Sequence, residues 1–304
     1  MKITIIGVGS VGSLLSFQMA TSGLVSEIVL FDINNKRSQA EALDINHAMP
    51  HYNGFCKIYA TTDYEETRDS DFIVLTASIP FPVKKDAQGN LISTNREDMA
   101  EANIKLYNNI IPELINYSPD GFYIVVANPN DVIVRLISET TSIPKHRVIG
   151  TGTTIDTGRI LNILSRQLNR QLHTPEIFVI GEHGDRQFIP QCYNSEKEAG
   201  SNSAFILQAL NETQQIFVNK NYSTNFAISS ACRALIIAII RDDHIIMPLS
   251  SHFELDNLHG YLSMPRLITA KGIEHTIQPE LNEDEIKLLK ESIQAVKKYD
   301  LISH

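Results

Sequence analysis

The chain has 304 residues, of which 43% are hydrophobic and 20% are charged, and its formal net charge is −9. This length is typical of two domains of about 150 residues each, and the negative charge argues against a nucleic-acid-binding surface, which needs Lys and Arg side chains to neutralise phosphates. Three scattered cysteines, Cys56, Cys192 and Cys232, are too few for a disulfide framework or a zinc cluster. We therefore expect a cytoplasmic protein that uses no metal.

Short apolar runs alternate with helical patterns through the first half of the chain. Runs rich in Ile, Val, Leu and Phe occur at residues 2–7, 27–32, 71–77 and 122–128, and they predict strands that are covered on both faces, as in a parallel sheet. The intervening segments predict helices at 10–22, 36–48, 98–117 and 130–140. Such alternation predicts right-handed βαβ units and a doubly wound α/β sheet. No run approaches the length of about 18 apolar residues that a membrane span needs.

The second half of the chain is more mixed. Pro144 and a strand-like segment at 147–152 mark the expected boundary between a first domain, 1–149, and a second, α+β domain, 150–304. Helices are predicted at 156–168, at about 224–241 and at 283–299. In the last helix one apolar stripe, which predicts a core or subunit contact, is formed by Ile286, Leu289, Ile293 and Val296.

A glycine-rich loop lies between the first predicted strand and the first predicted helix. Gly7, Gly9 and Gly12 have the G-x-G-x-x-G spacing: the first allows a tight turn, the second lets a pyrophosphate approach the backbone, and the third lets the helix pack closely on the strand. Asp32 ends the next strand, where a carboxylate can bind both ribose hydroxyls of an adenosine and repel a 2′-phosphate. We therefore expect NAD rather than NADP. Arg37 either moderates that preference or lies on the surface of the following helix.

Polar residues also follow later strands. Asn128 ends the strand at 122–128, so it either contacts a ligand at the carboxyl edge of the sheet or caps the helix that Pro129 begins. Asp156 and Arg159 are three residues apart and share a helix face. They form either a surface ion pair or a working pair in which Asp156 faces an imidazole and Arg159 offers its planar fork to a carboxylate.

His183 stands in the sequence VIGEHGDRQF, after an apolar run at 178–180 that predicts the end of a buried strand. Glycines at positions 181 and 184 flank it and leave the imidazole uncrowded. An unperturbed histidine titrates near neutral pH, and a partner carboxylate raises that pKa. These features suit a general acid/base, and the alternative is an ordinary core or surface histidine with a single hydrogen bond.

Together these motifs resemble the L-lactate/malate dehydrogenase family, which includes the L-2-hydroxyisocaproate dehydrogenases. The resemblance covers essentially the whole chain and implies an NAD-binding Rossmann domain over 1–149, a catalytic domain over 150–304, and a homodimer or homotetramer. The segments that carry it are GVGSVG (7–12), FD (31–32), NRED (95–98), ANPND (127–131), PKHRVIGTG (144–152), IDTGR (155–159), GEHGD (181–185) and TNFAIS (224–229).

The resemblance also implies a role for each polar residue. His183 would give a proton to the substrate carbonyl oxygen as NADH delivers hydride, and Asp156 would hold the tautomer of the ring. Arg159 would bind the substrate carboxylate, Arg96 would polarise the carbonyl, and Asn128 and Thr224 would line the site. The implied cofactor-binding residues are Gly7, Val8, Gly9, Ser10, Val11, Gly12, Asp32, Arg37, Thr76, Ala77, Ser78, Asn103 and Asn128.

The segment 77–95 departs from the family pattern, because it is longer than usual and carries Ser78 in place of a glycine. The specificity position falls on Phe81 or Asn90, and neither is the arginine that malate would need. Lys84 or Lys85 could still pair with a second carboxylate, and Gln88 could act as in lactate-specific relatives. L-lactate and pyruvate are the best prediction, with malate and L-2-hydroxyisocaproate as alternatives; Phe81 and Pro82 would suit the latter. Gly89 is the predicted hinge of a lid.

Three further expectations concern regulation, the absence of catalysis and metal binding. Leu161 and Glu176 occupy the positions where relatives activated by fructose 1,6-bisphosphate carry an arginine and a histidine, so we expect no such activation. A silent NAD-binding module would keep the glycines and Asp32 but would not need the four catalytic side chains. His47 and His51 do not predict a metal site, because a proline between them disrupts the helix.

Overall fold

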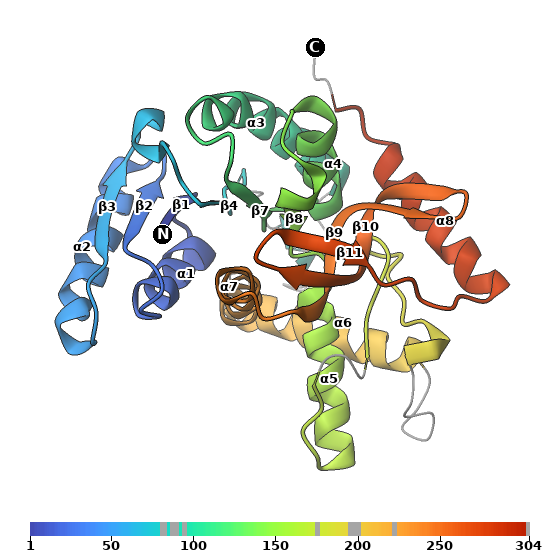
Figure 1. Ribbon diagram of the computed structural model, residues 1–304. Helices are drawn as coiled ribbons and strands as arrows, with labels where there is room; N and C mark the ends of the chain where they lie inside the picture. Colours follow the sequence, from blue (N-terminus) through green and yellow to red (C-terminus); the bar gives the residue numbers. More distant parts are fainter. Residues whose placement is uncertain are drawn as a thin grey trace.

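A sheet of nine strands crosses the molecule in the computed structural model (Figure 1). The structure describes residues 1–79, 84–85, 91–92, 96–173, 177–193, 202–220 and 224–301, without the side chains of 84–85, 91–92, 96–98 and 202–203. Six parallel strands run in the order β3-β2-β1-β4-β7-β8, the doubly wound arrangement expected from the sequence. Their bounds are β1 Lys2–Ile6, β2 Glu27–Phe31, β3 Lys57–Thr61, β4 Phe72–Leu75, β7 Phe122–Val125 and β8 Val148–Gly150.

Helices cover both faces of this sheet. One core cluster contains apolar side chains of α3, α4 and α8, and a second contains those of α1, α2 and α7; Figure 1 shows α3 and α4 on one side of the sheet and α1 and α7 on the other. Both clusters draw residues from the two halves of the chain. The bounds are α1 Ser10–Ala20, α2 Asn35–Ala48, α3 Arg96–Tyr117, α4 Asn130–Thr140, α7 Asn225–Arg241 and α8 Glu283–Lys297.

Three antiparallel strands extend the sheet beyond β8. β9 meets β8 at the pair Gly150–Ser250, and β10 and β11 follow in order. The predicted fold class, a Rossmann sheet followed by an α+β half, is thereby confirmed. The remaining elements are β9 Ile245–Leu255, β10 Leu258–Thr269, β11 Gly272–Thr276, α5 Thr154–Leu168 and α6 Asn202–Lys220, the β5–β6 pair of Lys84–Lys85 with Leu91–Ile92, and short 3₁₀ turns at Met49–His51, Tyr64–Thr67, Lys145–Arg147 and Gln191–Tyr193.

The last helix, α8, confirms the predicted apolar stripe. Leu289, Ile293 and Val296 are buried in the core cluster that also contains α3 and α4, and Ile286 is half-buried beside them. The helix begins with a capping box in which Asn282 and Glu285 bind each other's backbone N–H groups. The stripe is therefore a core contact within the chain.

Two expectations about local structure were wrong, and one strand was missed. The run at 178–180 is buried but forms only isolated bridges, Ile180 with Phe188 and Gly181 with Ser263, instead of a strand. Asn128 does not cap α4, because the helix begins one residue later with Pro129 in the N-cap position. β3 was not predicted, because this edge strand is only half-buried and lacks a continuous apolar run.

Within the described residues, no single helix is long and apolar enough to cross a membrane; one pair, Ala204–Lys220 and Asn225–Arg241, would pass that test together but is bent by 116°. The three cysteines are all free, with Cys56 and Cys232 buried and Cys192 exposed.

Candidate active site

The glycine loop has the geometry that its spacing predicts. Gly7 has a φ of +94°, and a Cβ added there would lie 2.5 Å from the Cα of Ala77. A Cβ on Gly12 would lie 2.2 Å from the carbonyl oxygen of Gly7, so only glycine lets α1 pack this close to β1. By contrast, nothing lies within 4 Å of a Cβ built on Gly9. The space in front of Gly9 at the N-terminus of α1 therefore fits an approaching pyrophosphate.

Asp32 connects this loop to the end of β2. One carboxylate oxygen accepts a hydrogen bond from the Val8 N–H at 2.7 Å, and the other accepts one from the Asn34 N–H at 2.8 Å. The side chain is half-buried and stands beside the loop, as an adenosine-binding acid would. Arg37 is exposed on α2, where its Nε lies 3.9 Å from Glu41 in a weak surface pair.

Segments at the carboxyl ends of β4 and β7 are held together by Asn103. Its amide is fully buried and donates to the Asn128 carbonyl at 2.6 Å and to the Ser78 hydroxyl at 3.0 Å, and it accepts the Ile79 N–H at 2.9 Å. Thr76 donates its hydroxyl to the Gly7 carbonyl at 2.5 Å. Asn103 therefore acts on these loops rather than presenting a free amide.

The carboxylate of Asp156 bridges an imidazole and a guanidinium. One oxygen lies 2.8 Å from Nδ1 of His183, and the other accepts a 2.8 Å hydrogen bond from Arg159. The Asp156 side chain is 7% exposed, whereas those of His183 and Arg159 are 22% and 20% exposed. The surface-ion-pair interpretation of Asp156 and Arg159 is therefore wrong, and both partner side chains remain partly accessible.

The bridge sets the charge state of the site. Burial alone would raise the pKa of Asp156, but the neighbouring His183 and Arg159 outweigh it and hold that pKa below its usual value. Burial alone would lower the pKa of His183, but Asp156 outweighs it and raises that pKa. Because Nδ1 faces Asp156, Nε2 is the nitrogen left to exchange a proton with a substrate.

A second carboxylate, Asp131, lies at this site and was missed from the sequence. It is buried at the start of α4, where one oxygen accepts the backbone N–H of His183 at 2.7 Å and the other accepts the hydroxyl of Ser250 in a very short contact. Burial raises the pKa of Asp131 to about 6, although both hydrogen bonds oppose the rise. Its charge also raises the pKa of His183. The available signal was its position in ANPND, three residues after Asn128.

The structure brings none of the remaining predicted residues into the Asp156 bridge among the contacts it describes. Asn128 is exposed. Thr224 is half-buried and is the N-cap residue of α7. Arg96 begins α3, but its side chain lies outside the described part of the chain. Most of the 77–95 segment, with Phe81, Pro82, Gln88, Gly89 and Asn90, and also Glu176, lies outside the described residues. Leu161 is a residue of α5 and is buried in the apolar cluster that contains side chains of α5 and α6.

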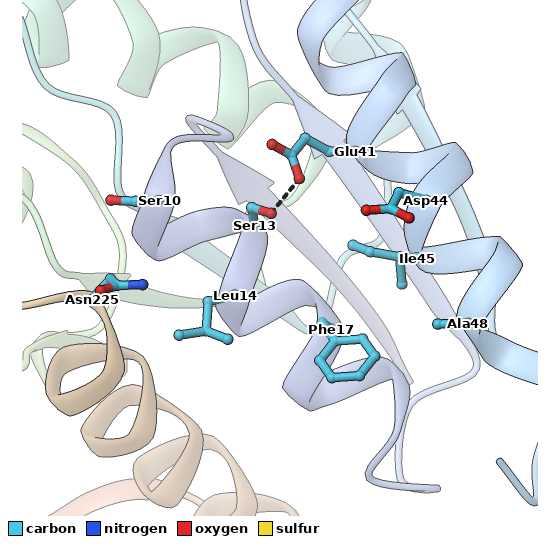
Figure 2. A pocket seen from close by; sticks show the side chains of 9 residues that line it. All are labelled: Ser10, Ser13, Leu14, Phe17, Glu41, Asp44, Ile45, Ala48 and Asn225. Atoms are coloured by element: carbon cyan, nitrogen blue, oxygen red, sulfur yellow. Dashed lines mark hydrogen bonds between the residues drawn. The ribbon is translucent and has the colours of Figure 1, made fainter. Parts of the chain in front are cut away.

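A separate pocket of about 390 Å³ lies between α1 and α2 (Figure 2). Ser10 and Asn225 lie at one end of it, and Glu41, which accepts the Ser13 hydroxyl at 2.5 Å, and Asp44 lie on its α2 wall. It contains none of the three side chains of the Asp156 bridge, and its carboxylates do not suit a phosphate. Among the described residues no group of three His, Cys, Asp or Glu side chains could hold a metal ion.

Comparisons with known proteins show the family of the chain. The family description "lactate/malate dehydrogenase, NAD binding domain" matches residues 1–150, and "lactate/malate dehydrogenase, alpha/beta C-terminal domain" matches residues 153–300. The chain is 31% identical to an L-lactate dehydrogenase of Acetivibrio thermocellus, with 96% of this chain and 93% of the relative covered, and 32% identical to one of Clostridium perfringens, with 95% and 93% covered.

Solved structures share the fold. A lactate dehydrogenase of Cryptosporidium parvum superposes with a TM-score of 0.85 at 24% identity, and a malate dehydrogenase of Salinibacter ruber superposes with a TM-score of 0.83 at 25% identity. In both cases 98% of this chain and 96% of the other chain are covered.

Proposed function

Because the chain belongs to the lactate/malate dehydrogenase family, we propose that it is an NAD-dependent L-2-hydroxy acid dehydrogenase that interconverts L-lactate and pyruvate. The observation that carries this proposal is the Asp156 bridge, which places a proton-exchanging imidazole next to an accessible guanidinium. A module that only bound NAD would have no use for this arrangement.

The glycine loop and Asp32 would hold the cofactor. The open space at Gly9 and the first N–H groups of α1 suit the pyrophosphate, and the Asp32 carboxylate suits the ribose hydroxyls and disfavours a 2′-phosphate. When bound, NADH supplies the hydride for carbonyl reduction. Asn103 would hold the segments that follow β4 and β7 in place beside the cofactor, through its hydrogen bonds to Ser78 and Asn128.

His183 would move the proton. In pyruvate reduction the protonated ring donates from Nε2 to the carbonyl oxygen, and in lactate oxidation neutral Nε2 accepts the hydroxyl proton. Asp156 keeps Nδ1 protonated in both directions and stabilises the imidazolium. Because the pKa of His183 is raised, its acid form persists to higher pH, and pyruvate reduction is lost as pH rises through that pKa.

Arg159 would hold the substrate. Only one of its nitrogens donates to Asp156, so the rest of the planar fork suits a two-point contact with the substrate carboxylate. We assign Arg96 the polarisation of the carbonyl, and Asn128 and Thr224 the lining of the site, by family resemblance.

We extend the proposal to the setting of the enzyme. It comprises an NAD-binding domain over 1–149 and a catalytic domain over 150–304, works in the cytoplasm as a homodimer or homotetramer, and needs no fructose 1,6-bisphosphate. Support comes from the family matches, the three free cysteines and the replacement residues Leu161 and Glu176.

The direct test follows NADH oxidation with pyruvate, oxaloacetate and 2-oxoisocaproate as separate substrates. We expect the highest kcat/KM for pyruvate. A clear preference for oxaloacetate would replace lactate by malate, a preference for 2-oxoisocaproate would indicate an apolar pocket, and silence with all three would refute the dehydrogenase proposal.

A further inference from the structure

A cavity of about 490 Å³ lies between α4, α8, β9 and β10, away from the Asp156 bridge. Its lining includes five cationic or protonatable side chains that come from five different segments, and only one carboxylate, Glu139, among the described residues. The five are Arg135 of α4, Lys145 of the 145–147 turn, His252 of β9, His259 of β10 and Lys297 of α8.

The single carboxylate is already engaged. Arg135 donates Nε to both oxygens of Glu139 at 3.2 Å, and its Nη1 donates to backbone carbonyls at the end of α8 at 3.2 to 3.3 Å. By contrast, the side chains of Lys145, His259 and Lys297 make no hydrogen bond or ion pair with the described residues. Among the described residues, therefore, the two lysines of this lining have no carboxylate partner.

A buried guanidinium adds to this charge. Arg266 is 1% exposed, and its described partners are all neutral: the carbonyl oxygens of three β-strand residues and the Thr276 hydroxyl. Burial, together with Lys145, Arg266 and His259, holds the pKa of His252 below its usual value, and only Glu254 opposes this. Arg266 thus adds a guanidinium close enough to His252 to act on its charge.

We propose that this cavity binds a small organic phosphate through its phosphate group. Lysine ammonium and imidazole groups are compact donors that can converge on a tetrahedral dianion, whereas the planar fork that a carboxylate prefers is already used by Arg135 and Glu139. The volume lies in the range of about 300–1,000 Å³ that is usual for small-ligand pockets.

The experiment titrates the full chain with inorganic phosphate, pyrophosphate and citrate by calorimetry at constant ionic strength. We expect saturable binding of pyrophosphate at one site with a Kd in the millimolar range or tighter, weaker binding of phosphate, and the weakest binding of citrate. The variants Lys145→Ala and Lys297→Ala should each weaken pyrophosphate binding by about tenfold. In NMR spectra, the bound anion should raise the pKa of His252.

The matched control is Lys287→Ala, which removes an exposed lysine from the same helix about 15 Å along its axis from Lys297. Its affinity should stay within about twofold of wild type, because the distance exceeds the Debye length. Absence of saturable pyrophosphate binding, an equal loss in Lys287→Ala, or citrate binding as tight as pyrophosphate would overturn the proposal.

Discussion

The glycine loop is one continuous stretch of chain between β1 and α1. The second site, the His183 cluster, consists of Asp131, Asp156, Arg159, His183 and Ser250. These residues come from α4, α5, the turn after residue 180, and β9. In the loop, backbone conformation and missing side chains create the site. In the cluster, side chains create the site: buried Asp131, Asp156 and Ser250 hold the partly exposed His183 and Arg159, and they lie on separate elements. The first site should therefore respond to added atoms, and the second to lost charges and hydrogen bonds.

The largest effect should come from removing the imidazole. We expect His183→Gln to lower kcat for pyruvate reduction by about 10³-fold, within the usual range for a general acid. The Kd for NADH should stay unchanged, because no hydrogen bond among the described residues joins His183 to the glycine loop. Stopped-flow kinetics and fluorescence titration measure the two quantities. Full activity in this variant would refute the assigned role. It would also remove the distinction between a loop that binds the cofactor and a cluster that transfers the proton.

Asp156→Asn should be the next largest, at about 10²-fold in kcat, the lower end of the range for general acid–base catalysis, because the amide can hold the wrong tautomer of His183. The pKa of His183 should fall once the carboxylate is gone, so the high-pH limb of pyruvate reduction should move to lower pH. A pH profile of kcat/KM measures this shift. An unchanged limb would show that Asp156 does not control the imidazole.

Gly9→Ala tests the loop by adding one methyl group. The position has a φ of −81° and open space, so the melting temperature should change by no more than about 2 °C. The methyl would occupy the space of the pyrophosphate, and NADH affinity should fall about tenfold. Gly7→Ala is the contrasting variant, because its positive φ and contact with Ala77 should cost about 1–3 kcal/mol of folding free energy. Unaltered NADH binding in Gly9→Ala would argue against this cradle.

The smallest effect should come from Asp131→Asn. The amide can still accept the His183 N–H, so kcat below pH 6 should stay within about threefold of wild type. Loss of the charge should move the alkaline limb down by less than about one pH unit, less than in Asp156→Asn, because Asp131 binds the backbone and not the ring. Asp131→Ala, which releases the turn as well, should lose more activity. If the two variants behave alike, the charge alone matters.

Several local features of the molecule could be predicted from the sequence pattern without knowledge of the tertiary packing. The glycine spacing, the acid after β2 and the shared face of Asp156 and Arg159 depend on a few consecutive residues, and their geometry is local. Buried parallel strands were also predictable, because both of their faces are apolar. The edge strand β3 and the long strands β9 and β10 lack that signal and were not predicted.

The sequence by itself therefore predicted the glycine loop and the layered sheet, since periodicity and turn chemistry act over a few residues, and the roles proposed for the polar side chains came from the family resemblance. Only the tertiary structure decided that Asp131, bound by Ser250, lies against the backbone of His183, and that five cationic or protonatable side chains line one cavity. These contacts join residues dozens to more than a hundred positions apart, and the burial that shifts their pKa values exists only once the elements have packed.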